Sequence, residues 1–223
     1  MRVLLFGATG SAGGSVLNVC LEASLVDEVQ VVTRRPLTKT HSKLRVVTHN
    51  DFLDYSRVAN AFERIDAVLY CLGISATQVS EEPAYRRITH DFAVAAARRM
   101  KESSPRAVFQ FVSGGGARVD SRRMWARVKA ETERDLMAEV SAVCWRPAFI
   151  DGETSSSSPR LFQLLRPLGR LFAPFQSLYV AGEDIGLAML QATTEGIRNR
   201  IIENPEIRAM ARRAGPSISG ARQ

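Results

Sequence analysis

Three glycines near the start of the chain, Gly7, Gly10 and Gly13, have the spacing of a turn that binds nucleotide phosphates. An apolar run leads into them and a helical pattern follows. In such a turn the first glycine permits a sharp exit from the strand, the second lets the backbone approach a pyrophosphate, and the third lets the helix pack closely on the strand. Phosphate is then expected at the N-terminus of the helix, where unpaired N–H groups and the positive end of the helix dipole meet it. The candidate contacts are Gly7, Thr9, Gly10, Ser11, Ala12 and Gly13.

The residues about 20 positions after the glycines distinguish two dinucleotides, because NAD sites usually carry an acidic residue there for the ribose hydroxyls. This chain has Arg34 and Arg35 instead, at the end of a strand predicted at residues 29–33. Two guanidinium groups match a 2′-phosphate through charge-assisted hydrogen bonds. The sequence therefore favours NADP(H) as cofactor. The alternatives are a solvated strand end for the arginines and a purely structural turn for the glycines.

Strand patterns alternate with helical patterns along the chain. Strands are predicted at residues 3–6, 29–33, 44–48, 67–71, 107–112 and 142–146, and helices at 11–21, 55–61, 84–101 and 121–139. Such alternation predicts an α/β fold, in which helices cover both faces of a parallel sheet and right-handed crossovers wind it into a Rossmann-type, doubly wound arrangement. Ligands of such sheets bind at the carboxyl ends of the strands, so the candidate residues are expected to converge there.

The pattern fits one nucleotide-binding domain over residues 1–213. Beyond residue 146 we predict a helix at 160–171, a strand at 178–180, a helix at 183–192 and a strand–helix pair at 200–213. Residues 148–180 form the expected substrate-side segment, whose apolar side chains would line a pocket, close the core or make a contact in a homodimer. Residues 214–223 contain Gly, Pro and Ser and are predicted to be a flexible tail.

Composition predicts the cellular compartment of the protein and the redox state of its cysteines. The chain has 223 residues, 45% of them hydrophobic, enough for one well-filled core. No run is long enough to span a bilayer and the apolar start lacks a cleavable signal pattern, so we expect a cytoplasmic protein with no membrane partner. Cys20, Cys71 and Cys144 are an odd number without metal-like spacing, and we expect reduced core thiols and no metal site.

The formal net charge of +7 raises the question of a nucleic-acid partner. The basic residues are scattered over helical patterns, however, and no known nucleic-acid-binding motif accompanies them. We therefore expect the charge to attract an anionic cofactor or substrate instead.

Several short motifs together resemble the short-chain dehydrogenase/reductase superfamily, in its atypical, extended-like branch. The resemblance is closest to the Tat-interacting-protein group and its bacterial relatives, and it covers nearly the whole chain. The motifs that carry it are the Gly-Ala-Thr-Gly-x-x-Gly turn, Thr33-Arg34-Arg35, Asp51-Phe52, Cys71-Leu72-Gly73, Phe111-Val112-Ser113, Lys129 and Arg146-Pro147.

The resemblance implies a cofactor contact for most of these motifs. It implies that Asp51 and Phe52 contact the adenine. The segment Cys71-Leu72-Gly73 would pass its backbone along the ribose, and Pro147-Ala148 would flank the nicotinamide amide. Taken alone, Asp51 could instead cap a helix and Gly73 could be a simple turn.

The resemblance also implies chemistry at Ser113 and Lys129. In this superfamily a serine orients the substrate carbonyl, and a tyrosine four residues before the lysine donates the proton. The position four residues before Lys129 is Trp125, whose indole has no acidic proton near neutral pH. Tyr85 and His90 are two alternative proton donors.

Two functions remain open at this point. One is an NADPH-dependent oxidoreductase that reduces a small carbonyl, quinone or enone, including an apolar carbonyl, with Ser113 and Lys129. Such an enzyme remains open because hydride transfer depends on geometry more than on an acid. The other is a catalytically weak NADP(H)-binding protein that regulates or scaffolds a protein partner. Trp125 is the residue that keeps the second open.

Overall fold

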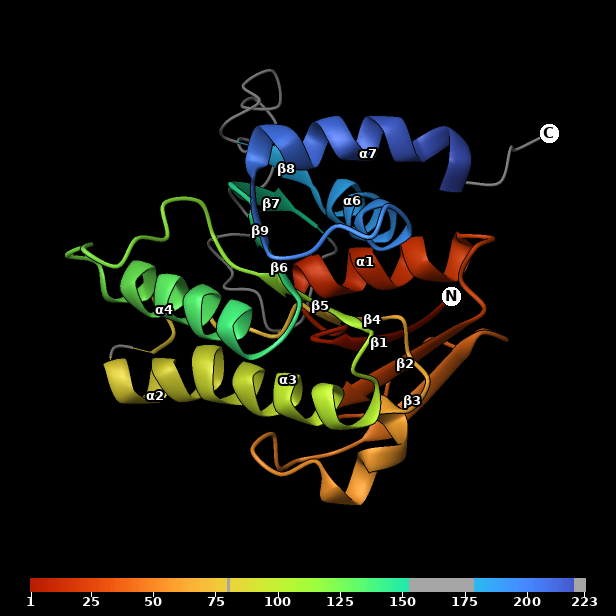
Figure 1. The fold of residues 1–223 in the computed structure, drawn as a ribbon, viewed down its shortest axis with the longest axis horizontal. Coiled ribbons are helices and arrows are strands. Elements are labelled where there is room, and N and C mark those ends of the chain that lie inside the picture. Colours follow the sequence, from red (N-terminus) through yellow and green to blue (C-terminus); the bar gives the residue numbers. More distant parts are fainter. Residues whose placement is uncertain (80, 153–178, 219–223) are drawn as a thin grey trace.

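Seven parallel strands form the central sheet of this computed structural model, which describes residues 1–79, 81–152 and 179–218. The strand order is β3-β2-β1-β4-β5-β6-β9, and every neighbouring pair is parallel. Helices cover both faces of the sheet (Figure 1). The predicted doubly wound α/β fold is therefore confirmed.

The sheet strands are β1 (Arg2–Phe6), β2 (Glu28–Thr33), β3 (Leu44–Thr48), β4 (Ala67–Tyr70), β5 (Val108–Val112), β6 (Ala142–Arg146) and β9 (Arg200–Glu203). Two short strands, β7 (Phe149–Asp151) and β8 (Tyr179–Ala181), pair in parallel outside this sheet. The helices are α1 (Ser11–Glu22), the 3₁₀-helix η1 (Ser56–Phe62), α2 (Glu82–Arg86), the π-helical turn η2 (Arg87–Asp91), α3 (Phe92–Ser103), α4 (Met124–Glu139), α6 (Gly182–Thr194) and α7 (Asn204–Ile218).

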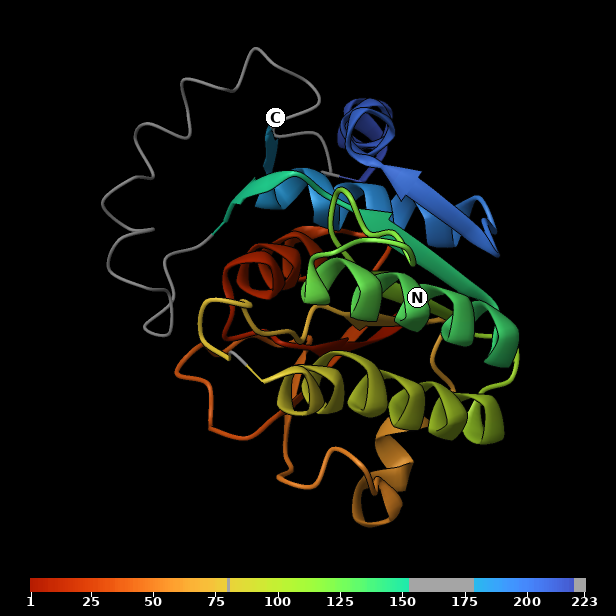
Figure 2. The same cartoon turned by 90° about the vertical axis from the view of Figure 1, so that its left-hand side faces the viewer.

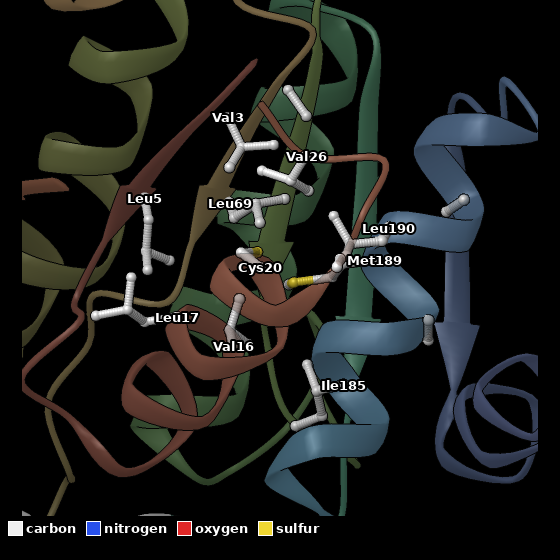
Figure 3. Close-up of a cluster of buried hydrophobic side chains, with 14 of the residues drawn as sticks. Val3, Leu5, Val16, Leu17, Cys20, Val26, Leu69, Ile185, Met189 and Leu190 are labelled. Atoms are coloured by element: carbon white, nitrogen blue, oxygen red, sulfur yellow. The ribbon is translucent and has the colours of Figure 1, made fainter. Parts of the chain in front are cut away.

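One face of the sheet packs on α1, α6 and α7. In β1, Val3 and Leu5 point to this face and belong to one buried cluster with Val16 and Leu17 of α1 and Met189 of α6 (Figure 3). The other face, toward η1, α3 and α4, takes the alternate residues of the same strand. Because β1 is buried on both sides, its sequence is an unbroken apolar run rather than an alternating one.

The helices α2, η2 and α3 run parallel to α4 on one side of the molecule (Figure 2). Three side-chain pairs join these neighbouring helices, each between residues 45 positions apart: the ion pairs Glu82–Arg127 and Arg86–Glu131 and the hydrogen bond between His90 and Asp135. These pairs fix the side of α4 that faces α2, and leave another side to face the sheet.

The structure departs from the predicted elements in several places. The helix predicted at 55–61 is the 3₁₀-helix η1, helix α4 begins at Met124 rather than at residue 121, and strand β7 was not predicted. The single helix expected at 84–101 contains the π-helical turn η2. Helix α7 continues to Ile218, and both Ala214 and Ile218 are buried, so the predicted tail is wrong for residues 214–218. Ala214 and Ile218 are four residues apart, so both lie on the buried side of the helix and stabilise its last turn. The Gly and Pro between them had favoured a flexible tail in the prediction. The helix predicted at 160–171 and most of the substrate-side segment lie outside the described residues.

In the described ranges, no helix has the length and apolar character needed to cross a membrane.

Candidate functional site

The glycine turn is in tight contact with the loop that follows β4. Gly7 has a φ of +81°, and a Cβ there would lie 2.5 Å from the carbonyl carbon of Cys71. A Cβ on Gly13 would lie 2.1 Å from the carbonyl oxygen of Gly7. No side chain fits at either position, so the two glycines allow α1, the end of β1 and the Cys71–Gly73 loop to meet.

The N-terminus of α1 is built to receive an anion. Gly10 is its N-cap and has no side-chain capping bond, and the first intrahelical bond runs from Gly14 N to Gly10 O over 2.8 Å. The amides of Ser11, Ala12 and Gly13 precede that bond, so they have no acceptor within the helix. The first turn carries no acidic residue. A phosphate would therefore meet N–H donors and the positive end of the helix dipole.

The residues around this helix end are accessible from outside. Gly73, three residues beyond the end of β4, is exposed, and a Cβ there would have no heavy atom within 4 Å. Thr9 is exposed, and Ser11 and Ala12 are half-buried. The residues of the turn and of the Cys71–Gly73 loop thus fit the phosphates and ribose of a dinucleotide. Burial raises the pKa of the half-buried Cys71 thiol, so it stays protonated.

Arg34 and Arg35 lie exposed at the carboxyl end of β2. The hydroxyl of Thr33 donates to the carbonyl of Arg35 over 3.0 Å and shapes this corner. In the described part of the chain, no carboxylate pairs with either guanidinium. The next strand ends beside them, because His49 N donates to Thr33 O over 2.9 Å. Two uncompensated cations therefore stand next to the position expected for the adenine ribose.

Asp51 and Phe52 follow β3, and the Phe52 side chain differs from its implied role. Phe52 is 4% exposed, and its ring packs edge-on against Phe6 and beside Phe92. This ring is part of the core, so only the backbone of Phe52 is free to contact an adenine. The exposed carboxylate of Asp51 accepts from Leu53 N over 3.1 Å, which is a local turn bond rather than a helix cap.

Ser113 follows β5 and is held in a buried network. Its hydroxyl donates to Glu133 of α4 over 2.5 Å. The same carboxylate accepts from Arg146 through Nε at 2.9 Å and Nη2 at 2.6 Å. The Glu133 side chain is 2% exposed and that of Arg146 is 19% exposed, and the pairing raises the pKa of the Arg146 guanidinium further. Ser113 is thus brought beside Lys129 as predicted, but its hydroxyl is bonded to a carboxylate.

Lys129 lies on the same side of α4 as Glu133, one turn earlier. Its ammonium donates to the carbonyl oxygen of Ser113. Burial is the main cause that lowers the pKa of Lys129 to about 8, and the nearby Glu133 carboxylate opposes this shift. A Cβ on Gly114 would lie 3.3 Å from Lys129 Nζ and 3.8 Å from the Trp125 ring, so Gly114 leaves room for both side chains.

The loops after β5 and β6 are bonded to each other. Gly115 N donates to Pro147 O over 2.8 Å, and Ala148 N donates to the Asn204 side chain over 2.8 Å. Pro147 and Ala148 therefore lie beside the Ser113 loop. The amide of Ala148 is already bonded, which leaves its other atoms for a nicotinamide. A Cβ on Gly152 would lie 2.4 Å from Ser11 O, so the chain after β7 returns to the glycine turn.

The two alternative proton donors are engaged elsewhere. His90 is hydrogen-bonded to Asp91 over 2.8 Å and to Asp135 over 2.9 Å, and the second of these bonds joins η2 to α4. Asp135 is two residues beyond Glu133, on another side of the helix. Tyr85 is 1% exposed, and burial raises its pKa, which makes its hydroxyl a weaker acid.

Glu133 was not among the residues predicted from the sequence, and Arg146 was named only as part of the Arg146-Pro147 motif. A signal for Glu133 was present, because Trp125, Lys129 and Glu133 are spaced by four residues and so share one side of a helix. Asn204 and Gly152 had no such signal, since only the tertiary fold brings them to Ala148 and Ser11.

A pocket of about 810 Å³ lies outside this network, between α4, the loop after β5 and β9, with Glu133 and Arg146 on its wall.

We expect the Glu133→Ala substitution to destabilise the fold by about 3 kcal/mol, because it leaves a largely buried Arg146 without its main partner. Glu203 is the matched control, since it bonds the same guanidinium over 3.0 Å but is 57% exposed. Its replacement by alanine should cost less than about 1 kcal/mol. Urea unfolding of both variants measures the difference. Equal losses would show that the buried pair does not stabilise the structure.

Comparison with known proteins gives relatives and structural neighbours. No family model matches the chain. It is 26% identical over 227 residues to the protein FMP52, mitochondrial, of Eremothecium gossypii, covering 95% of this chain and 98% of the relative. The protein of the same name from Kluyveromyces lactis is 28% identical over 233 residues, with 95% and 99% covered.

These relatives contradict the cytoplasmic location predicted from the sequence, since the curated proteins of this name are designated mitochondrial. The prediction relied on the lack of a secretory signal and of a membrane-spanning run. Neither feature bears on mitochondrial targeting, because targeting segments of that kind are amphipathic and rich in arginine rather than apolar.

Solved structures show the fold class. DesIV, a dTDP-glucose 4,6-dehydratase from Streptomyces venezuelae with NAD and TYD bound, has a TM-score of 0.70 at 15% identity, covering 95% of this chain and 80% of that one. An oxidoreductase of the short-chain dehydrogenase/reductase family from Burkholderia thailandensis has a TM-score of 0.68 at 17% identity, with 93% and 92% covered. The Bordetella bronchiseptica enzyme WbmF, in complex with NAD+, has a TM-score of 0.68 at 13% identity, with 100% and 79% covered. The chain thus has the Rossmann-type fold of short-chain dehydrogenase/reductase enzymes.

Proposed function

We propose that this protein binds NADP(H) and transfers hydride between that cofactor and a small carbonyl, quinone or enone. One observation carries the proposal. The helix end that suits a phosphate and the Ser113–Lys129 pair lie at the carboxyl ends of the parallel strands β1 and β5, separated in the sheet only by β4. A dinucleotide laid along this edge would have its phosphates at one end and its nicotinamide at the other.

The choice of NADP(H) over NAD(H) rests on Arg34 and Arg35. Neighbours such as DesIV and WbmF are described with NAD, so the fold alone does not distinguish the two cofactors. Both arginines are exposed, without a carboxylate partner in the described ranges. An unpaired guanidinium gains most from a phosphate, which accepts two parallel hydrogen bonds.

The side chains near Ser113 would orient the reacting groups. The reduced cofactor, when bound, supplies the hydride. Lys129 would hold the nicotinamide ribose, and the Trp125 ring, packed over Gly114 and Gly116, would keep water from that end of the site. Asp51, the backbone of Phe52 and the Cys71–Gly73 loop would bind the adenosine half, and Pro147-Ala148 would flank the nicotinamide.

A weakly catalytic regulatory protein is the second candidate, and two observations favour it. Trp125 stands where the superfamily has its tyrosine acid, and the Ser113 hydroxyl is bonded to Glu133. In that case NADP(H) occupancy would control a protein partner or a homodimer contact. The similarity to the Tat-interacting-protein group belongs to this proposal, as does a mitochondrial location, which is supported by the names of the FMP52 relatives.

Replacing both Arg34 and Arg35 by alanine should weaken NADPH binding by on the order of 100-fold, because two charge-assisted bonds to the 2′-phosphate are lost. NADH binding should change little. Calorimetric titration of each cofactor measures this. Arg212 and Arg213, another exposed adjacent pair, provide the control with the same change of charge on α7. Equal losses of the two cofactors in the Arg34/Arg35 variant would contradict the NADP(H) assignment.

Turnover separates the two candidate functions. We expect the wild-type protein to consume NADPH, followed by its absorbance, with at least one acceptor among aldehydes, ketones, quinones and enones. Activated acceptors should react fastest, because the tyrosine acid is missing. Tight NADPH binding without consumption across the panel would instead support the regulatory protein.

A further inference from the structure

We propose that Lys129 is the catalytic residue that donates the proton, with Ser113, Glu133 and Arg146 as the positioning residues that hold its ammonium in place. The inference rests on the proposed oxidoreductase function and assigns the acid that Trp125 cannot supply. It is carried by a count of the hydrogens and lone pairs around the site.

The hydrogen of the Ser113 hydroxyl is already used. A serine hydroxyl has one hydrogen to donate, and a carboxylate only accepts. Glu133 accepts two bonds from Arg146 and the third from Ser113, and Ser113 is 2% exposed. Donation to a substrate oxygen would leave a lone pair of this buried carboxylate without its donor, which costs free energy. Ser113 therefore anchors α4 to β5.

The other candidate acids are also unsuitable. Trp125 is a neutral donor with no acidic proton. His90 is bonded to two carboxylates on the side of α4 that faces η2. Tyr85 is buried and its pKa is raised. Of the titratable groups in the described part of the chain, Lys129 is the one that combines an available hydrogen with a place beside Ser113.

Lys129 has the hydrogens and the access that the reaction needs. Its ammonium carries three hydrogens, and the carbonyl of Ser113 accepts one of them. Lys129 is half-buried as a residue, and Gly114 places no side chain against its Nζ. The lowered pKa of about 8 keeps the amine protonated at neutral pH and makes it a stronger acid than an ordinary lysine.

The proposed step balances in atoms and charge. The acceptor carbon gains a hydride from the reduced nicotinamide, and the π electron pair of its C=O bond moves to oxygen. That oxygen takes a proton from Lys129 Nζ. The neutral amine that results regains a proton from water, so the enzyme returns to its starting state.

The charged groups around Lys129 decide how its acidity responds to substitution. Glu133 lies on its own helix, and Arg146 of β6 compensates that carboxylate. β5 and the turn after it bring only Ser113 and glycines, and β4 ends in the protonated thiol of Cys71. Arg127, Glu131 and Asp135 of α4 are paired toward α2 and η2. Glu133 is therefore the group expected to raise the pKa of Lys129.

A titration without cofactor tests the acid itself. The other lysines of the chain are Lys39, Lys43 and Lys101, so isotope-labelled lysine side chains give few signals in NMR spectra. The Lys129 signal is identified by its loss in Lys129→Arg, and it should titrate near pH 8. Glu133→Gln should move its titration to lower pH, since the carboxylate stabilises the ammonium. A Lys129 signal that titrates near the ordinary lysine value of about 10 would overturn the proposal.

Turnover at saturating NADPH tests the role of the acid. In the wild-type protein kcat should fall tenfold per pH unit above about pH 8, where the amine loses its proton. Lys129→Met should lower kcat by at least about 100-fold, the usual contribution of a general acid. Lys129→Arg should lower kcat to a similar extent and remove the alkaline fall, because a guanidinium keeps its charge but does not give up its proton. Lys101→Met, an exposed lysine of α3, is the control.

The outcomes separate this inference from the function on which it rests. If the wild-type protein turns over and Lys129→Met retains its rate, only the assignment of Lys129 is wrong. If the wild-type protein reduces none of the acceptors, the oxidoreductase function fails and the inference fails with it. A pH profile that Glu133→Gln leaves unmoved would contradict the role of Glu133 as a positioning residue.

Discussion

The contact between the glycine turn and the loop after β4 is the constraint on which the rest of the site depends. Cys71 and Leu72 come so close to Gly7 that a single Cβ would collide with their backbone, and the same holds for Gly13 against Gly7. This approach sets the position of α1 on the sheet and aims its first amides at the strand ends. It also leaves Gly73 exposed at the same edge of the sheet. Backbone packing alone thus places the unpaired amides of α1 where a phosphate is expected.

The positions of Ser113 and Lys129 depend on a different interaction. Glu133 and Arg146 form a buried pair that joins α4 to β6, and Ser113 adds β5 to the same carboxylate. The desolvation of a buried ion pair offsets much of its Coulombic attraction, so its net contribution to the free energy of folding is small. We therefore interpret this pair as one that positions side chains. The network presents Lys129 beside the strand ends, where a superfamily tyrosine would ordinarily be the acid. Because Trp125 stands at the position of that tyrosine and has no acidic proton, the proposal assigns the role of the acid to Lys129.

Local patterns predicted most of the fold, and tertiary contacts decided what they missed. The glycine spacing, the strand at residues 29–33 with its two arginines, and the alternation of elements are local, and the structure has them. The buried ring of Phe52 was misjudged because burial depends on η1 and α3, which pack over it. Glu133 of α4 was overlooked because its partner, Arg146, is thirteen residues further along the chain, on strand β6. The end of α7 was misplaced because Gly and Pro outweighed two apolar side chains.

The most direct test of a dinucleotide lying along this edge is to follow backbone amide resonances while NADPH is added. The account predicts that the largest changes fall on Ser11, Ala12, Gly13 and Gly73, with smaller ones at Arg34 and Arg35 and at Gly114. Changes confined to α7, or to the pocket between α4 and β9, would show that the cofactor binds elsewhere, and would contradict the account.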